Sequence, residues 1–202
     1  MPEAVKILLE ILLVVALVAA NGFFVAAEFA LVKVRASQLR PLAKTGGWKV
    51  KFALKATEHL DSALSATQLG ITLASLGLGW VGEPFVARRL TPFLADWGVT
   101  DPTAVHSISF AVAFVLITFL HIVFGEQAPK MLAIQCAKPV TLWLSAPLMA
   151  FHFVFYPFIW LLNETANRIL RWAGLDPAGG SEHDFSSEEL EYVFSQARHS
   201  HP

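Results

Sequence analysis

Four long apolar segments place the tightest limit on how this chain can fold. Residues 62–82, 102–125 and 139–163 contain no Asp, Glu, Lys or Arg, and residues 11–32 are interrupted only by Glu28. Each segment is close to or above the roughly 20 residues that a helix needs to cross about 30 Å of hydrocarbon. The sequence therefore predicts an all-α membrane protein that is held within the lipid bilayer.

The composition argues against a soluble helical protein. Of the 202 residues, 55% are hydrophobic and only 15% are charged, whereas an average soluble domain carries about 25% charged residues. The polar remainder of the chain is too small to enclose four apolar helices. There is also no pairing of a nucleophile with a base and no phosphate-binding loop, so we do not expect an enzyme.

Basic residues are concentrated directly after the first apolar segment. Seven Lys and Arg residues, and no acidic residue, lie between Glu28 and Glu58. Positive charge beside a membrane segment is retained on the cytoplasmic side, which predicts an N-terminus outside the cell. Arg168 and Arg171 follow the last apolar segment and predict a cytoplasmic C-terminus. We attribute these basic residues to membrane topology and expect no nucleic-acid binding.

Three apolar segments then lie between two cytoplasmic points, and three full crossings cannot return the chain to the same side. Prolines that favour kinked or interrupted helices occur throughout the last third of the chain: Pro129, Pro139, Pro147 and Pro157. We therefore expect three transmembrane helices plus a short helical hairpin within residues 125–165 that does not cross. The sequence TGGW at 45–48 separates two further short helices, of which the second, about 48–60, is expected to lie at the membrane interface.

Polar residues line one face of several apolar segments. Asn21 and Glu28 are seven residues apart in the first segment, and Glu126 follows the third segment, in which His121 and Gly125 share a face. The second segment carries a stripe of small and polar residues: Ser65, Gln68, Thr72, Ser75 and Gly79. Such residues serve helix packing, or they supply oxygen ligands to a hard cation.

Local pairing offers a structural explanation for the acidic residues. Glu28 precedes Lys33 by five residues, and Glu126 precedes Lys130 by four, a favourable order for a helical ion pair. The opposing consideration is that ionisable residues inside membrane segments are costly and mark ion or proton pathways. The sequence leaves both interpretations open, and it favours an interface or packing role for His121.

Three stretches together resemble the CorC/cyclin-M family of magnesium transport proteins, a branch long labelled hemolysin-like. They are NGFFVAAEFALVKVR (21–35), SATQLGITLASLGLGWVGEP (65–84) and GEQAPKMLA (125–133). The resemblance covers roughly residues 5–175. It implies a homodimer in the cytoplasmic (inner) membrane, whose protomers each have three transmembrane helices, a pair of short helices and a juxtamembrane helix belt in contact with membrane lipid.

The resemblance also implies a domain order. Residues 1–175 are expected to form the transmembrane domain, and residues 176–202 an acidic linker helix that leads to CBS domains absent from this chain. Ser186 and Glu189 fit a capping box at the start of that helix. ATP would act only through the CBS domains.

The resemblance further implies a function, which is Mg²⁺ export coupled to a sodium gradient. The family's magnesium site maps onto four residues here: Glu126, Gly125, Thr72 and Ser75. Asn21, Glu28 and Gln68 are expected to line the pathway or to accompany the coupling ion. Val25 and Ala27 stand where many members have serines, and the second helix lacks the family's asparagines. Because these ligands are missing, export of a cationic small molecule such as a polyamine, or a regulatory module without transport, remain alternatives.

Overall fold

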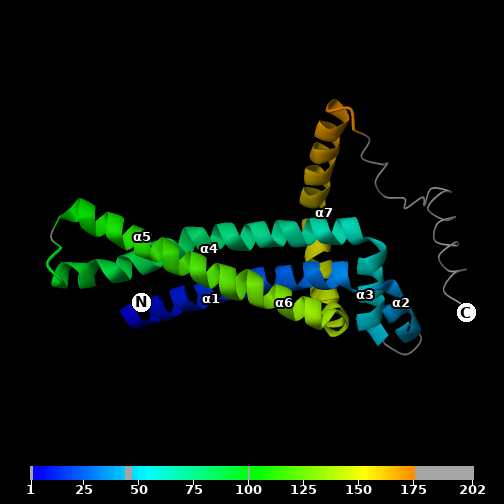
Figure 1. The fold of residues 1–202 in the computed structure, drawn as a ribbon, viewed down its shortest axis with the longest axis horizontal. Helices are drawn as coiled ribbons and strands as arrows, with labels where there is room; N and C mark the ends of the chain where they lie inside the picture. The colour runs from blue at the N-terminus through cyan, green and yellow to red at the C-terminus, as the bar shows by residue number, and fades with distance from the viewer. Residues whose placement is uncertain (1, 44–46, 100, 176–202) are drawn as a thin grey trace, which may run out of the picture. The chain divides into compact units, whose positions relative to one another are not determined.

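The computed structural model describes residues 2–43, 47–99 and 101–175, and these residues form helices without any strand. The elements are α1 (Glu3–Lys33), α2 (Ala36–Leu39), η1 (Arg40–Leu42), α3 (Gly47–Glu58), α4 (Leu60–Asp96), α5 (Pro102–Leu120), η2 (His121–Gln127), α6 (Ala128–Gln135) and α7 (Ala137–Trp172). The all-α prediction is therefore confirmed for the described part of the chain (Figure 1).

Four helical segments are long and apolar enough to cross a membrane: Glu3–Lys33, Leu60–Asp96, Pro102–Gln135 and Ala137–Trp172. They contain the four predicted apolar segments. Large apolar side chains face outward on them, among them Val115, which is 66% exposed, and Phe153, which is 82% exposed. Such an outward face suits lipid rather than water, and the chain is a multi-pass membrane protein.

Close backbone approaches hold α1 against its neighbours. Gly22 packs against Pro129 of α6, and a Cβ added to Gly22 would lie 2.9 Å from the proline Cγ. On the other side of α1, the Phe24 ring fills the space that a Cβ at Gly70 of α4 would occupy. These small residues let α1 lie beside both α4 and the η2–α6 segment (Figure 1).

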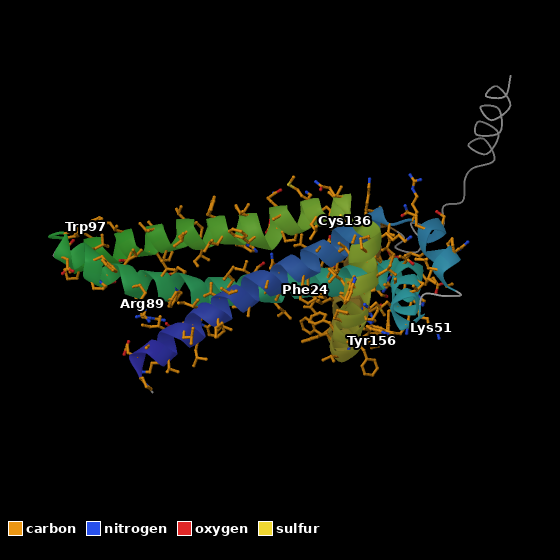
Figure 2. All side chains as sticks on the ribbon, turned by 90° about the horizontal axis from the view of Figure 1, so that it is seen from below. Phe24, Lys51, Arg89, Trp97, Cys136 and Tyr156 are labelled. Carbon is orange, nitrogen blue, oxygen red and sulfur yellow. The ribbon has the colours of Figure 1, made fainter. Side chains whose placement is uncertain are left out.

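The turn between α4 and α5 is formed by residues with clear conformational roles. Gly98 has φ +86, a left-handed conformation that glycine adopts readily, and it follows the end of α4. Asp101 then caps α5 by accepting hydrogen bonds from the backbone N–H groups of Thr103 and Ala104, at 3.4 and 3.2 Å. Trp97 marks this end of the molecule in Figure 2, and Lys51 lies at the opposite end.

The two short helices separated by TGGW are present as α2–η1 and α3. Val50 and Ala53 of α3 are buried, and Ala53 packs with Val34 and Leu39 near the end of α1. Residues 44–46 lie outside the described chain, and Gly47 at the start of α3 has φ +62.

Within residues 125–165, where the sequence predicts a short helical hairpin, α6 and α7 meet at a turn at Cys136. The second helix, α7, is longer than a short hairpin needs and continues for 36 residues. Pro147 and Pro157 lie inside α7, and Pro84 and Pro92 lie inside α4, so the prolines do not end these helices. The part of α7 up to Ile159 runs across α1 and α4 instead of lying beside them (Figures 1 and 2).

The chain divides into two compact units, residues 1–159 and residues 160–202. In the second unit, Glu164 forms ion pairs with Arg168 and Arg171, at 3.5 and 2.9 Å. The predicted acidic linker helix, with Ser186 and Glu189, lies outside the described residues.

Candidate functional site

A cluster of polar side chains lies where α1, α4 and η2 meet. The Asn21 amide is fully buried, and its Nδ2 donates to the Gly125 carbonyl oxygen at 3.1 Å. The same Nδ2 lies 3.0 Å from His121 Nε2, and the Ser75 hydroxyl donates to Asn21 Oδ1 at 3.2 Å. The cluster therefore joins three helices that are far apart in sequence.

The backbone of η2 explains why the Gly125 carbonyl is available to Asn21. Pro129 has no N–H, so it cannot donate to the carbonyl four residues earlier as a residue of a regular α-helix would. Residues His121–Gln127 form a π-helix instead, a wider geometry that is frequent at functional sites. Gly125 also permits the close contact, since a Cβ there would lie 3.0 Å from Asn21 Nδ2.

His121 Nε2 faces two groups of the cluster. It lies 3.0 Å from Asn21 Nδ2 and 3.2 Å from the Ser75 hydroxyl oxygen, and the imidazole tautomer sets which of these atoms donates. Glu126 Oε1 lies 3.6 Å from the same Nε2.

The predicted ion pair between Glu126 and Lys130 is not formed. Lys130 Nζ lies over the Phe29 ring, 4.7 Å from its centre. Within the described residues, Glu126 makes no ion pair with any Lys or Arg, and its side chain is 43% exposed. The predicted pairing of Glu28 with Lys33 is absent as well, because Glu28 forms no ion pair in the described chain.

The structure brings together only part of the predicted site. Asn21, Ser75, Gly125 and Glu126 lie in or beside the cluster. Thr72 and Gln68 are exposed, and the Thr72 hydroxyl donates to the Gln68 carbonyl oxygen of its own helix at 2.8 Å. Glu28 is half-buried, two helical turns along α1 from Asn21 or about 10 Å along the axis.

A cavity of about 290 Å³ between α4 and α5 adjoins the cluster. Ser75 and His121 contribute to its wall, together with Thr118 and Glu83. Glu83 lies inside the candidate span of α4, eight residues after Ser75 and on the same helix face. The cavity thus carries a carboxylate that sequence reasoning did not single out, and Glu126 is not among its lining residues.

His121 is the other residue that sequence reasoning missed as a site residue. It lies five residues before Glu126, and an α-helix would place two such residues on different faces. The π-helix brings His121 Nε2 to within 3.6 Å of the Glu126 carboxylate. Among the described residues, no group of three or more His, Cys, Asp or Glu side chains is arranged to hold a metal ion.

Comparison with known proteins assigns the chain to a family. A family model described as the cyclin M transmembrane N-terminal domain matches residues 12–201. The UPF0053 protein YhdT of Bacillus subtilis is 46% identical over 190 residues, which are 93% of this chain and 41% of YhdT. The UPF0053 protein YugS of the same organism is 40% identical over 191 residues, 95% of this chain and 44% of YugS. The chain thus spans less than half the length of these relatives.

Proposed function

The chain belongs to the family of cyclin M transmembrane N-terminal domains, and on this premise we propose that it transports Mg²⁺ out of the cell. The family assignment and the membrane-spanning helices are consistent with a role in membrane transport. The proposal extends this to the ion, its direction and its site.

One observation carries the proposal, namely the Glu126 carboxylate in a candidate membrane span without a Lys or Arg partner among the described residues. An acidic group in such a segment is energetically costly, and a residue of this kind is by default interpreted as part of a functional site. Three further oxygens lie in the adjoining cluster, from the Gly125 carbonyl, the Ser75 hydroxyl and the Asn21 amide. Carboxylate and neutral oxygen ligands are those that Mg²⁺ prefers.

We propose that Asn21 takes the ligand position that the sequence assigned to Thr72. Asn21 Oδ1 accepts a hydrogen bond from the Ser75 hydroxyl, and the second lone pair of this amide oxygen can bind an ion. Glu28 and Gln68 stay assigned to the pathway or to the coupling ion.

The cavity beside the cluster suits an ion that retains water. Its volume of about 290 Å³ compares with the roughly 30 Å³ that one water occupies in the liquid. Mg²⁺ gives up its hydration shell reluctantly and keeps several waters in many sites. We propose that the ion enters this cavity hydrated, near Glu83, and exchanges waters for cluster oxygens.

The family resemblance supplies the remaining parts of the proposal. These are sodium as the coupling ion, a homodimer in the cytoplasmic membrane, an N-terminus outside, a cytoplasmic C-terminus, and regulation by ATP through CBS domains outside this chain. The part of α7 that runs across α1 and α4 supports three crossings, because a helix in that direction lies in the membrane plane when α1 and α4 span it.

A second candidate substrate is an organic dication such as putrescine. The observation in its favour is Glu83, which places a carboxylate in the cavity that Ser75 and His121 line, while Glu126, which does not line this cavity, lies 3.6 Å from His121 Nε2. Two separated carboxylates match the two amines of such a molecule better than they match a single ion.

The test is thermal unfolding of the purified chain in the presence of Mg²⁺, Ca²⁺ or putrescine, for the wild type and for Glu126→Gln. A ligand that binds only the folded state stabilises it by about 2.7 kcal/mol at a concentration of 100 times its Kd. We expect Mg²⁺ to raise the melting temperature of the wild type and to lose this effect in Glu126→Gln. Asp96→Asn is the matched control, because Asp96 is an exposed carboxylate at the end of α4.

Each result has a defined meaning. Equal stabilisation of wild type and Glu126→Gln by Mg²⁺ removes Glu126 from the site. Stabilisation by putrescine that is lost in Glu83→Gln, without any response to Mg²⁺, establishes the second candidate. No response to either ligand favours a regulatory module without transport.

A further inference from the structure

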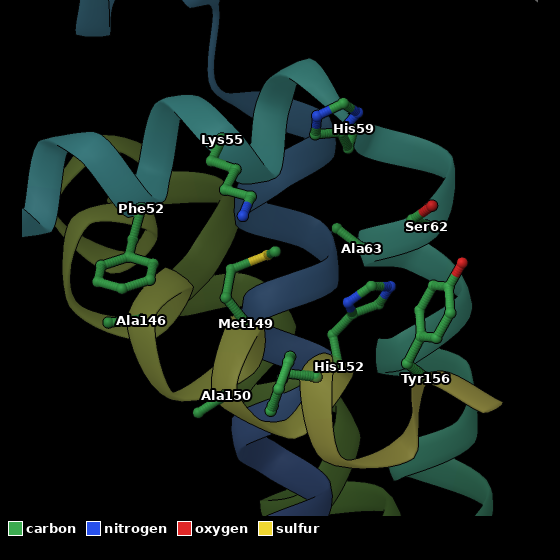
Figure 3. A pocket seen from close by; sticks show the side chains of 11 residues that line it. Phe52, Lys55, His59, Ser62, Ala63, Ala146, Met149, Ala150, His152 and Tyr156 are labelled. Atoms are coloured by element: carbon green, nitrogen blue, oxygen red, sulfur yellow. The ribbon is translucent and has the colours of Figure 1, made fainter. Parts of the chain in front are cut away.

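A second cavity lies at the end of the molecule that carries α3, and none of the cluster residues lines it. Its volume is about 450 Å³. The walls come from α3, from the first turn of α4 and from the part of α7 between Ala146 and Tyr156. In Figure 3, Lys55 and His59 lie on one side of the cavity, and His152 and Tyr156 lie opposite.

The polar groups of this cavity suit an anion. Lys55, His59 and His152 contribute basic side chains, and Ser62 and Tyr156 add hydroxyl donors. Lys55 forms no ion pair within the described residues.

No carboxylate belongs to the residues that line the cavity. Glu58 and Asp61 flank His59 in sequence, but both are exposed and neither lines it. The cavity therefore presents positive charge and hydrogen-bond donors without an internal counter-charge among its lining residues.

The rest of the wall is apolar. Phe52, Met149 and Phe153 line it together with small alanine side chains, and Phe153 is 82% exposed. A small soluble anion would leave these groups in contact with water. A molecule that has both an anionic head and an apolar body covers both parts of the wall.

The location matches the headgroup region of a membrane. Helix α3 buries Val50, Ala53 and Ala56 and carries Lys49 and Lys51 on its surface. Lys49 Nζ lies 3.0 Å from the centre of the Trp143 ring of α7. Tryptophan and basic residues gather where hydrocarbon meets the headgroups, which is the region of the lipid phosphates.

We propose that this cavity binds the phosphate of an anionic phospholipid, such as phosphatidylglycerol. The phosphate lies among Lys55, His59 and His152, and the glycerol and upper acyl chain lie on the apolar wall. The lipid thereby links α3, α4 and the first part of α7. This site is independent of the cation site, because the two share no residue.

The experiment titrates the detergent-purified chain with dioleoyl phosphatidylglycerol, dioleoyl phosphatidylcholine or inorganic phosphate, and follows melting temperature and lipid retention by native mass spectrometry. We expect stabilisation by phosphatidylglycerol alone. Lys55→Gln should weaken its apparent affinity about fivefold, the contribution of one basic residue near an anionic lipid surface. Lys51→Gln is the matched control, since Lys51 is exposed on the same helix and does not line the cavity.

His152→Gln provides a second variant, on α7, in case Lys55→Gln does not fold, and it should also weaken phosphatidylglycerol selectively. Equal weakening by Lys51→Gln and Lys55→Gln overturns the proposal in favour of diffuse surface charge. Equal binding of phosphatidylcholine shows an apolar site without charge selection, and stabilisation by inorganic phosphate alone shows a soluble anion as the ligand. Either result, like the absence of any lipid effect, rejects the anionic lipid.

Discussion

Two hydroxyl groups on α4, three residues apart, have different surroundings. Ser75 is half-buried and donates to Asn21 of α1, and its Oγ lies 3.2 Å from His121 Nε2 of η2. Thr72 is exposed and donates to the carbonyl of Gln68 within α4. A polar stripe on an apolar helix therefore becomes a site only where other helices bring hydrogen-bond partners to it.

The two regions also depend on different parts of the chain. The region of Thr72 and Gln68 needs only the helical backbone of α4, because its hydrogen bond is local. The cluster around Asn21 needs α1, α4 and η2 in register, with Gly22 and Gly125 permitting close approach. Substitutions in the cluster should therefore affect folding and ion binding together, and matched substitutions on the exposed face should leave folding nearly unchanged.

Asn21→Ala is the substitution with the largest expected effect. The side chain is fully buried and takes part in hydrogen-bonded contacts with Gly125, His121 and Ser75. At roughly 0.6 kcal/mol for each hydrogen bond in a membrane protein, the loss is about 2 kcal/mol of unfolding free energy. Unfolding by SDS in mixed micelles measures it. Gln68→Ala is the exposed control, and an equal loss there would abolish the distinction between the two regions.

Gly125→Ala should have the next largest effect. Its Cβ would lie 3.0 Å from both Asn21 Nδ2 and His121 Cδ2, and overpacking of this kind costs about 1–3 kcal/mol. Gly79→Ala is the same substitution on α4 at a position where no atom lies within 4 Å of the added Cβ. There we expect a gain of up to about 1 kcal/mol, because alanine favours a helix. Thermal unfolding of both variants distinguishes the outcomes, and equal effects would show that η2 does not need a glycine.

The fold was largely predictable because apolar length is a direct requirement of the bilayer. Residues 62–82 and 102–125 predicted helices, and both lie inside longer ones. The continuity of α7 through Pro147 and Pro157 was not predictable from the rule that proline interrupts helices. A proline removes one backbone hydrogen bond, and neighbouring groups can compensate within a membrane helix.

The site was predictable only in part, for a related geometric reason. Asn21, Ser75, Gly125 and Glu126 lie together as the polar pattern and the family resemblance indicated. Thr72 was assigned to the same set because the polar stripe places it on the same face of the helix as Ser75. The stripe does not indicate the angle at which a neighbouring helix meets that face. His121 was missed because the π-helix changes the residue period on which facial patterns depend.

Ser75→Ala should have the smallest effect on stability, and it tests the comparison most directly. Removing the hydroxyl eliminates its hydrogen bond to Asn21, at a cost of about 0.6 kcal/mol. Thr72→Ala should leave the unfolding free energy nearly unchanged, because the lost hydrogen bond is local to α4 and alanine favours the helix. The informative measurement is the Mg²⁺ concentration that gives half of the maximal rise in melting temperature. If Ser75 supplies an ion ligand and Thr72 does not, only Ser75→Ala should raise that concentration. A rise with Thr72→Ala instead would place the ion on the exposed face of α4, which would require a second protein surface to enclose it.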